Sequence, residues 1–205
     1  MLGIANAAAM GMWIAIAKIT LLEGKDIRDE RVQWAFLLAQ GYGVAEVCAI
    51  GLKRHVLSGD WRLKVLTQTG LGVCICLFRI LTVLVTFTAL PDARHAWLRR
   101  YLLTGWAFAD IAKYAALIIE MRAIQVLRRV VSAVLFPVVS SGEVYGIVQA
   151  QEKLQSPIWW VMALQGLLTV VALPPGTAYF GRAAWKGLTR KEKDAKGKKE
   201  EKKEQ

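Results

Sequence analysis

The chain begins with the apolar run LGIANAAAMGMWIAIAKITLL, from Leu2 to Leu22, and this stretch decides how the remainder is interpreted. A bilayer hydrocarbon core about 30 Å thick is crossed by roughly 20 residues of helix. The run has that length, and its one charged residue, Lys18, lies near its end. A cleaved signal peptide would start with basic residues. The run therefore predicts a helix that crosses the membrane.

Five further apolar runs follow, and each is long enough to cross a bilayer. We expect them at residues 32–52, 65–90, 97–119, 126–148 and 158–179. The connections between them are short, which makes sequential helices neighbours in an up-and-down bundle. The sequence thus predicts an all-α, multi-pass membrane protein. Its six-transmembrane-helix bundle covers residues 1–185, and a Lys/Glu-rich polar tail covers residues 186–205.

The net charge of +11 is concentrated in this tail and in the loops beside the apolar runs. Contact with the bilayer and its anionic headgroups explains such a distribution, and no motif indicates a nucleic-acid partner. The tail, TRKEKDAKGKKEEKKEQ, has no apolar face, so we expect it to be solvated and disordered unless a partner orders it. The three cysteines lie in apolar runs and the two histidines in loops, so no metal or other cofactor is expected.

The tail also bears on orientation and location. It gives the face carrying both termini an excess of Lys and Arg, which predicts cytoplasmic termini. The last four residues, KKEQ, place Lys202 and Lys203 as in the dilysine retrieval signal of endoplasmic-reticulum membrane proteins. We therefore expect the endoplasmic reticulum, with the mitochondrial inner membrane as the alternative.

Five ionisable residues lie within the apolar runs, where an unpaired charge costs several kcal/mol. They are Glu46, Arg79, Asp110, Lys113 and Glu143. Asp110 and Lys113 are three residues apart, so they share a helix face and are expected to pair directly. Arg79 then needs a carboxylate from another helix, either Glu46 or Glu143. Two interpretations stay open: an ion-pair network that fixes helix register, and a polar cavity for acid–base chemistry.

The fifth run contains the sharpest local pattern, LFPVVSSGE at residues 135–143. Pro137 favours a kink, and Gly142 permits close approach of another helix. Phe136 and Glu143 are seven residues apart, which returns them to nearly the same face about 10.5 Å along the axis. We expect both side chains to face the same cavity.

These residues resemble the protein tyrosine phosphatase-like A family, the very-long-chain 3-hydroxyacyl-CoA dehydratases of the endoplasmic reticulum. Residues 136–143, FPVVSSGE, are similar to the family pattern Y-P-x-G-x-x-G-E. Residues 106–114, WAFADIAKY, are similar to W-S-x-T-E-I-I-R-Y. Asn6, Gly11 and Trp13 look like the family's Y-N…G-W region, and Arg79 falls where the family has a Ser-Arg pair. The resemblance covers about residues 1–180 and is strong over 106–150.

The resemblance implies six helices, cytoplasmic termini and removal of water from a 3-hydroxyacyl-CoA by a tyrosine and a glutamate on the fifth helix. Glu143 matches the glutamate, but Phe136 stands at the tyrosine position. Phenylalanine cannot transfer a proton, and losing one positioned acid–base group typically costs about 10²–10⁴-fold in rate. Tyr114, on the polar face of the fourth run, is the candidate substitute donor.

Other departures from the family pattern also weaken the polar site. Asp110 and Lys113 stand where the family has glutamate and arginine, and lysine lacks the bidentate fork of arginine. Val139 stands at a family glycine, and Leu117 where the family often has a second tyrosine.

Three hypotheses follow. The first is a catalytically degenerate dehydratase-like protein that serves as an accessory, structural or lipid-binding subunit of a membrane complex. The second is an active dehydratase, a hydro-lyase of fatty-acid elongation that acts on acyl-CoA through Glu143 and a substitute donor. The third is a transporter or channel, although no repeat of broken helices supports it.

Overall fold

The computed structural model describes residues 2–53, 73, 75–83, 89–90, 95–119, 121–155 and 157–201 of the 205-residue chain. Its named helices are α1 (Leu2–Leu22), α2 (Glu30–Leu52), α4 (Ala96–Ile118), α5 (Arg122–Ala150) and α6 (Ile158–Glu201). Residues 75–81, between α2 and α4, are also helical. Over the described ranges the protein is all-helical and contains no strand, which confirms the predicted fold class.

Four helices, α1, α2, α5 and α6, contain spans long and apolar enough to cross a membrane. Many of their large apolar side chains face outward, among them Ile4, Leu38 and Val171, each at least 60% exposed. The chain is an integral membrane protein whose helices suit contact with the lipid bilayer. The third predicted run, 65–90, lies largely outside the described residues. α4, which contains four charged residues, is not among the four helices apolar enough to cross. Of the six predicted spans, four are thus supported.

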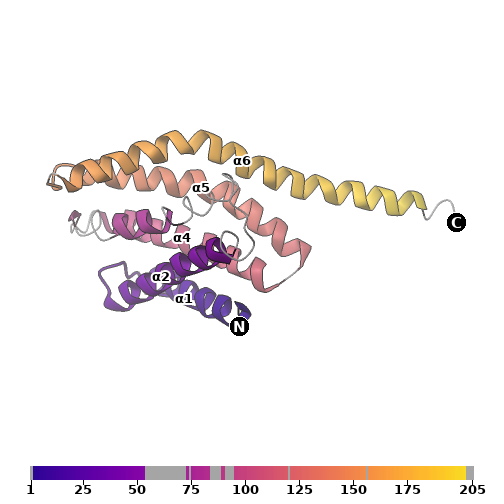
Figure 1. Cartoon of the computed structure of the whole chain (residues 1–205), viewed down its shortest axis with the longest axis horizontal. Coiled ribbons are helices and arrows are strands. Elements are labelled where there is room, and N and C mark those ends of the chain that lie inside the picture. Colours follow the sequence, from indigo (N-terminus) through magenta and orange to yellow (C-terminus); the bar gives the residue numbers. More distant parts are fainter. Residues whose placement is uncertain are drawn as a thin grey trace.

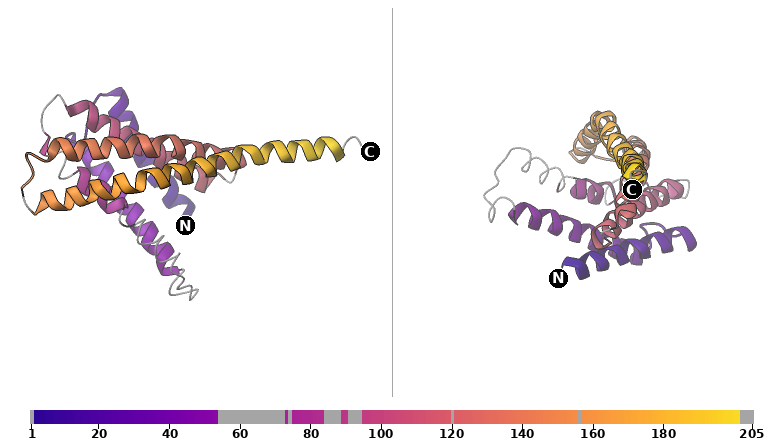
Figure 2. Two further views of the ribbon diagram at one scale, coloured as in Figure 1. Left: turned by 90° about the horizontal axis from the view of Figure 1, so that it is seen from above. Right: turned by 90° about the vertical axis from the view of Figure 1, so that its right-hand side faces the viewer.

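The contacts between the helices follow an order that differs from their order in the chain. α6 lies along α5, α5 packs on α4, and α4 packs on α1, which also contacts α2 (Figure 1). Sequential helices are neighbours, as the short connections predict. The contact between α1 and α4 is additional, and it places the middle of the chain against its beginning. Figure 2 shows the antiparallel α5–α6 pair on one side of the molecule and α1 and α2 on the other.

Aromatic side chains from three helices form the centre of the buried core. Trp13 of α1 meets Phe36 of α2 edge to face, with ring centroids 6.1 Å apart. Phe36 in turn lies 5.8 Å from the ring of Trp106 on α4. All three side chains are almost fully buried. Because such pairs contribute energy beyond their buried area, this core fixes α4 against α1 and α2.

The turn between α1 and α2 is tied to α4 by one carboxylate. Asp26 accepts hydrogen bonds from the backbone N–H of Arg28 at 3.0 Å and from Nε of Arg99 at 2.8 Å. Burial by itself would raise the pKa of the Asp26 carboxyl, but these donors outweigh it and hold the pKa below its ordinary value. Gly24 adopts a φ of 65°, a conformation that glycine reaches without steric cost.

Helix α6 is 44 residues long, or about 66 Å at 1.5 Å per residue. That length is about twice the thickness of a hydrocarbon core, so a large part of α6 must lie outside the bilayer. Figure 1 shows its C-terminal part extending away from the other helices. α6 continues as a helix to Glu201, where the sequence predicts a solvated tail that is disordered unless a partner orders it. Lys, Glu and Ala are strong helix formers, and α6 provides a helix that these residues simply continue.

Candidate functional site in the helix bundle

Two ion pairs join α4 to the elements around it. Nη1 of Arg79 lies 2.7 Å from Oδ2 of Asp110, and Nζ of Lys113 lies 2.5 Å from Oε2 of Glu46. Asp110 and Lys113 thus each bind a residue outside α4, and the expected direct pair between them is not formed. The prediction that Arg79 pairs with Glu46 or Glu143 is also wrong, because its guanidinium forms its hydrogen bond with Asp110. The reason is tertiary: oppositely charged side chains lie within reach on both sides of α4.

Glu46 is the acceptor at the α2 end of this polar region. Besides Lys113 it accepts a longer hydrogen bond from the hydroxyl of Tyr114, at 3.4 Å. The ring of Tyr114 lies under Nζ of Lys113 and 5.9 Å from the ring of Tyr42. The Tyr42 hydroxyl donates to Oδ1 of Asn6 on α1, at 2.8 Å. Tyr114, the candidate substitute donor, therefore binds Glu46 and not Glu143.

Glu143 has a different partner, the indole of Trp106. Nε1 of Trp106 donates to Oε1 of Glu143 at 2.7 Å. The guanidinium carbon of Arg79 lies 5.7 Å from the centroid of the same indole ring, and the Arg79 and Glu143 charges also interact. Trp106 thereby connects Glu143 with the Arg79–Asp110 pair. Sequence reasoning gave Trp106 no role, although its position four residues before Asp110 places both on one face of α4.

Phe136 packs on α6 and not on α4. Its ring is 5.1 Å from the ring of Phe180 on α6, and a Cβ added at Gly176 would lie 2.5 Å from its Cε1. The glycine is what allows the ring to pack so closely on α6. The expected cavity shared by Phe136 and Glu143 is therefore not found among the described residues. α5 packs between α4 and α6, so two side chains on nearly the same face of α5 can contact different helices. Glu143 contacts α4, and Phe136 contacts α6.

The contact between α4 and α5 explains two other features of the fifth-run pattern. Val139 packs directly on Gly105, where a Cβ would overlap its Cγ2 methyl group. A Cβ added at Gly142 would lie 2.9 Å from Cε1 of Tyr101 and 3.0 Å from Cδ2 of Leu102. The valine at the family's glycine position is thus accommodated by a glycine on the opposite helix.

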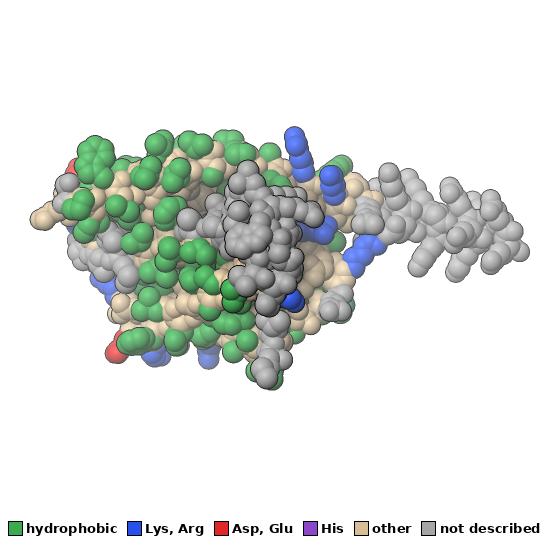
Figure 3. Space-filling model, viewed as in Figure 1, with side chains coloured by type: hydrophobic (Ala, Val, Ile, Leu, Met, Phe, Trp, Pro, Cys, Tyr) green, Lys and Arg blue, Asp and Glu red, His purple; other side chains and the backbone are tan. Residues whose placement is uncertain are grey.

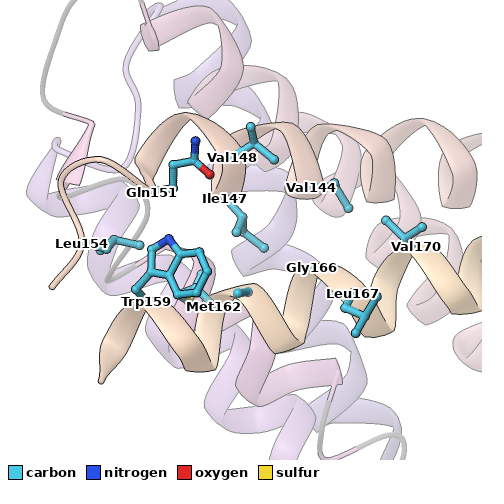
Figure 4. A pocket seen from close by; sticks show the side chains of 11 residues that line it. Val144, Ile147, Val148, Gln151, Leu154, Trp159, Met162, Gly166, Leu167 and Val170 are labelled. Carbon is cyan, nitrogen blue, oxygen red and sulfur yellow. The ribbon is translucent and has the colours of Figure 1, made fainter. Parts of the chain in front are cut away.

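Two pockets in the described part of the chain are both lined mainly by apolar side chains. The first, about 250 Å³, lies between α5 and α6 near the turn that joins them (Figure 4). Its lining includes Ile147, Trp159 and Met162, with Gln151 as a polar group at one end. The second, about 470 Å³, lies between α4 and α5 and contains a single charged residue, Arg128. None of the seven candidate site residues lines either pocket.

The polar region can hold charges in fixed positions, but its contacts are poorly arranged for proton transfer to a substrate. Both ion pairs are closed between protein groups. Glu143 accepts a hydrogen bond from an indole N–H, which does not act as an acid near neutral pH.

No protein-family model, curated protein or solved structure matches the chain.

Proposed function

We propose that the protein is a catalytically degenerate relative of the 3-hydroxyacyl-CoA dehydratases that acts as an accessory or structural subunit of a membrane complex. The observation that carries this proposal is the position of Phe136. The residue at the family's tyrosine position lacks the hydroxyl, and its ring is packed against Gly176 and Phe180. The ring thus lies against α6, whereas the carboxylate of Glu143 is bonded to Trp106 on α4.

The paired charges give independent support. Catalysis of water elimination needs a base for the α-proton and an acid for the departing hydroxyl, both within reach of a bound substrate. Here Asp110 and Glu46 are neutralised by Arg79 and Lys113. The Lys113–Glu46 pair ties α4 to α2, and the Arg79–Asp110 pair ties α4 to the helical segment 75–81, which is a structural role.

The alternative, an active dehydratase, rests on the retained carboxylate of Glu143. Its weakness is the missing acid, because the hydroxyl of Tyr114 is hydrogen-bonded to Glu46. Activity would require Tyr114 or another donor to move toward Glu143 when substrate binds. The transporter hypothesis has no specific contact in its favour.

Turnover by the purified full-length protein distinguishes these functions. With 3-hydroxyacyl-CoA substrates of several chain lengths, we expect no enoyl-CoA above the background of Glu143→Gln, which preserves side-chain size. We also expect Phe136→Tyr to remain inactive, because this ring packs on α6 while Glu143 is bonded to Trp106 on α4. Wild-type turnover that Glu143→Gln abolishes would overturn the degenerate interpretation.

The subunit role has its own test. After solubilisation of its native membrane in a mild detergent, we expect the protein to migrate on native gels with a larger assembly. Migration as an isolated chain under conditions that preserve other membrane complexes would contradict that role.

We further propose six membrane spans, with the third in residues 65–90, and cytoplasmic termini in the endoplasmic reticulum. The C-terminal Lys202 and Lys203 support this address, and the length of α6 would carry them clear of the headgroups. Glycosylation acceptors placed at each terminus should stay unmodified. Exchange of both lysines for serine should shift the protein out of the endoplasmic reticulum; unchanged location, or residence in mitochondria, would contradict the proposed address.

A further inference from the structure

The groove between α4 and α5 is apolar along its length and charged near one end. On α4 it is lined by Phe108, Ile111, Ala112 and Ala115, which share one helix face. On α5 its lining extends over residues 124–135, which is about 16 Å of helix. That length is close to the hydrocarbon thickness of one leaflet, about 15 Å. The groove can therefore hold one extended acyl chain.

The groove is open toward lipid. Phe108, Leu127 and Val134, all in its lining, are each about half exposed. A chain of the surrounding bilayer could enter sideways without any change in the helices. The small side chains of Ala112 and Ala115 provide the depth on the α4 side.

Arg128 is the one charged residue in the lining, and the length of α5 places it near the headgroups. The 29 residues of α5 span about 43 Å, which exceeds the hydrocarbon core by about 13 Å. Arg128 is about 9 Å from the first residue of α5, so it lies near this end of the helix. An arginine at this depth can hold the phosphate of a lipid through two parallel N–H donors.

Three further cations lie near Arg128 along the helix axis, one on α5 and two on α6. The side chain of Arg129 packs against Gly187 of α6, which brings it level with Arg182 and Lys186. Figure 3 shows Lys and Arg side chains gathered where the C-terminal part of α6 leaves the other helices. Within the described part of the chain, Arg128, Arg129, Arg182 and Lys186 form no ion pair with an acidic side chain.

Negative charge is missing from both helices in this region. The sequence contains no Asp or Glu from 121 to 142 or from 158 to 191. Glu120, just before α5, lies outside the described residues. The end of the α5–α6 pair therefore presents a positive field to the lipid headgroups on that side.

We propose that the groove between α4 and α5 binds one anionic phospholipid, with an acyl chain along the groove and its phosphate on Arg128. The site is separate from the polar region around Trp106, so it does not depend on the proposed loss of dehydratase activity. Two observations carry it together: an apolar groove of one leaflet's length, and a cluster of cations at its headgroup end. A zwitterionic lipid fits the groove equally well but gains less from the cations.

Native mass spectrometry of the delipidated full-length protein tests this site, with phosphatidylglycerol or phosphatidylcholine added back. We expect phosphatidylglycerol to be retained preferentially, and Arg128→Gln to weaken its binding about fivefold, the effect of one cation near the headgroups. Arg128→Lys should retain most of the binding. The control Lys25→Gln removes an exposed cation from the α1–α2 turn and should have no effect.

A second pair of variants tests the groove itself without changing charge. Ala112→Leu fills the groove and should reduce phosphatidylglycerol binding, whereas Ala163→Leu, in the pocket between α5 and α6, should not. If Arg128→Gln weakens phosphatidylglycerol binding and Ala112→Leu does not, the acyl chain does not occupy the groove, and only attraction of the headgroup to the cations remains. Equal losses in Arg128→Gln and Lys25→Gln would overturn a specific site. Displacement of the lipid by palmitoyl-CoA at equal concentration would overturn the assignment to a phospholipid.

Discussion

Helix α5 has two interfaces of opposite character. Toward α4 it offers Glu143, whose carboxylate accepts a hydrogen bond from Trp106 beside the charge of Arg79. Toward α6 it offers Phe136, whose ring packs on Gly176 and Phe180. The resemblance to the dehydratases places these two side chains in one reaction, but here they belong to separate contacts. In the function proposed above, the pair that the resemblance implies is therefore divided between two interfaces and also lacks the hydroxyl.

The largest expected effect comes from breaking the polar side. Asp110→Ala removes the partner of Arg79, which is mostly buried, and should destabilise the protein by about 3–5 kcal/mol. Unfolding in mixed micelles with increasing SDS, followed by circular dichroism, measures the loss. Removing both charges, with Arg79→Met added, should recover most of it. Additive losses in the double variant would show that the two side chains do not interact.

The apolar side is tested by Gly176→Ala. The added Cβ would lie 2.5 Å from the Phe136 ring, so we expect a loss of about 1–3 kcal/mol from overpacking. Gly181→Ala on the same helix is the matched control, because a Cβ there meets no atom within 4 Å. It should be neutral or slightly stabilising. If both variants lose stability equally, the close contact of Phe136 with α6 is not what limits this position.

A smaller effect is expected where the polar region reaches α1. Tyr42→Phe removes the donor to Asn6 and leaves a buried amide oxygen without it, at a cost of about 1–2 kcal/mol. Tyr145→Phe serves as the control, since that tyrosine is exposed and its ring contact with Trp97 survives the change. The same unfolding assay compares them. No difference between the two variants would mean that the bond to Asn6 contributes nothing.

The smallest expected effect is the dependence of stability on pH that comes from Asp26, in the turn between α1 and α2. Because its pKa is lowered in the folded state, its contribution to stability is present above the ordinary carboxyl pKa of about 3.9. The contribution is lost as the pH falls through that value and the folded pKa. Stability measured between pH 7 and pH 3 should decline only below about pH 4, and less steeply in Asp26→Asn. Equal slopes in the two proteins would contradict this role.

The sequence by itself determined the helices, because the length of an apolar run and the local backbone hydrogen bonds of a helix need no distant partner. α1 occupies Leu2–Leu22 as predicted, and α2, α4 and α5 differ from expectation by a few residues at their ends. The sequence also identified the ionisable residues within the apolar runs. Burying an unpaired charge costs free energy in any arrangement of the helices, so each of them needs a partner.

Only the tertiary structure decided how those residues are compensated. Spacing along a helix shows that Asp110 and Lys113 share a face, but not that Arg79 and Glu46 come closer to each of them. The separation of Phe136 from Glu143 likewise depends on α5 lying between two helices, with Gly176 opening room on one of them. Side-chain partners across helices are set by how the helices rotate and approach. That arrangement is a property of the whole packed bundle, and no single run of sequence encodes it.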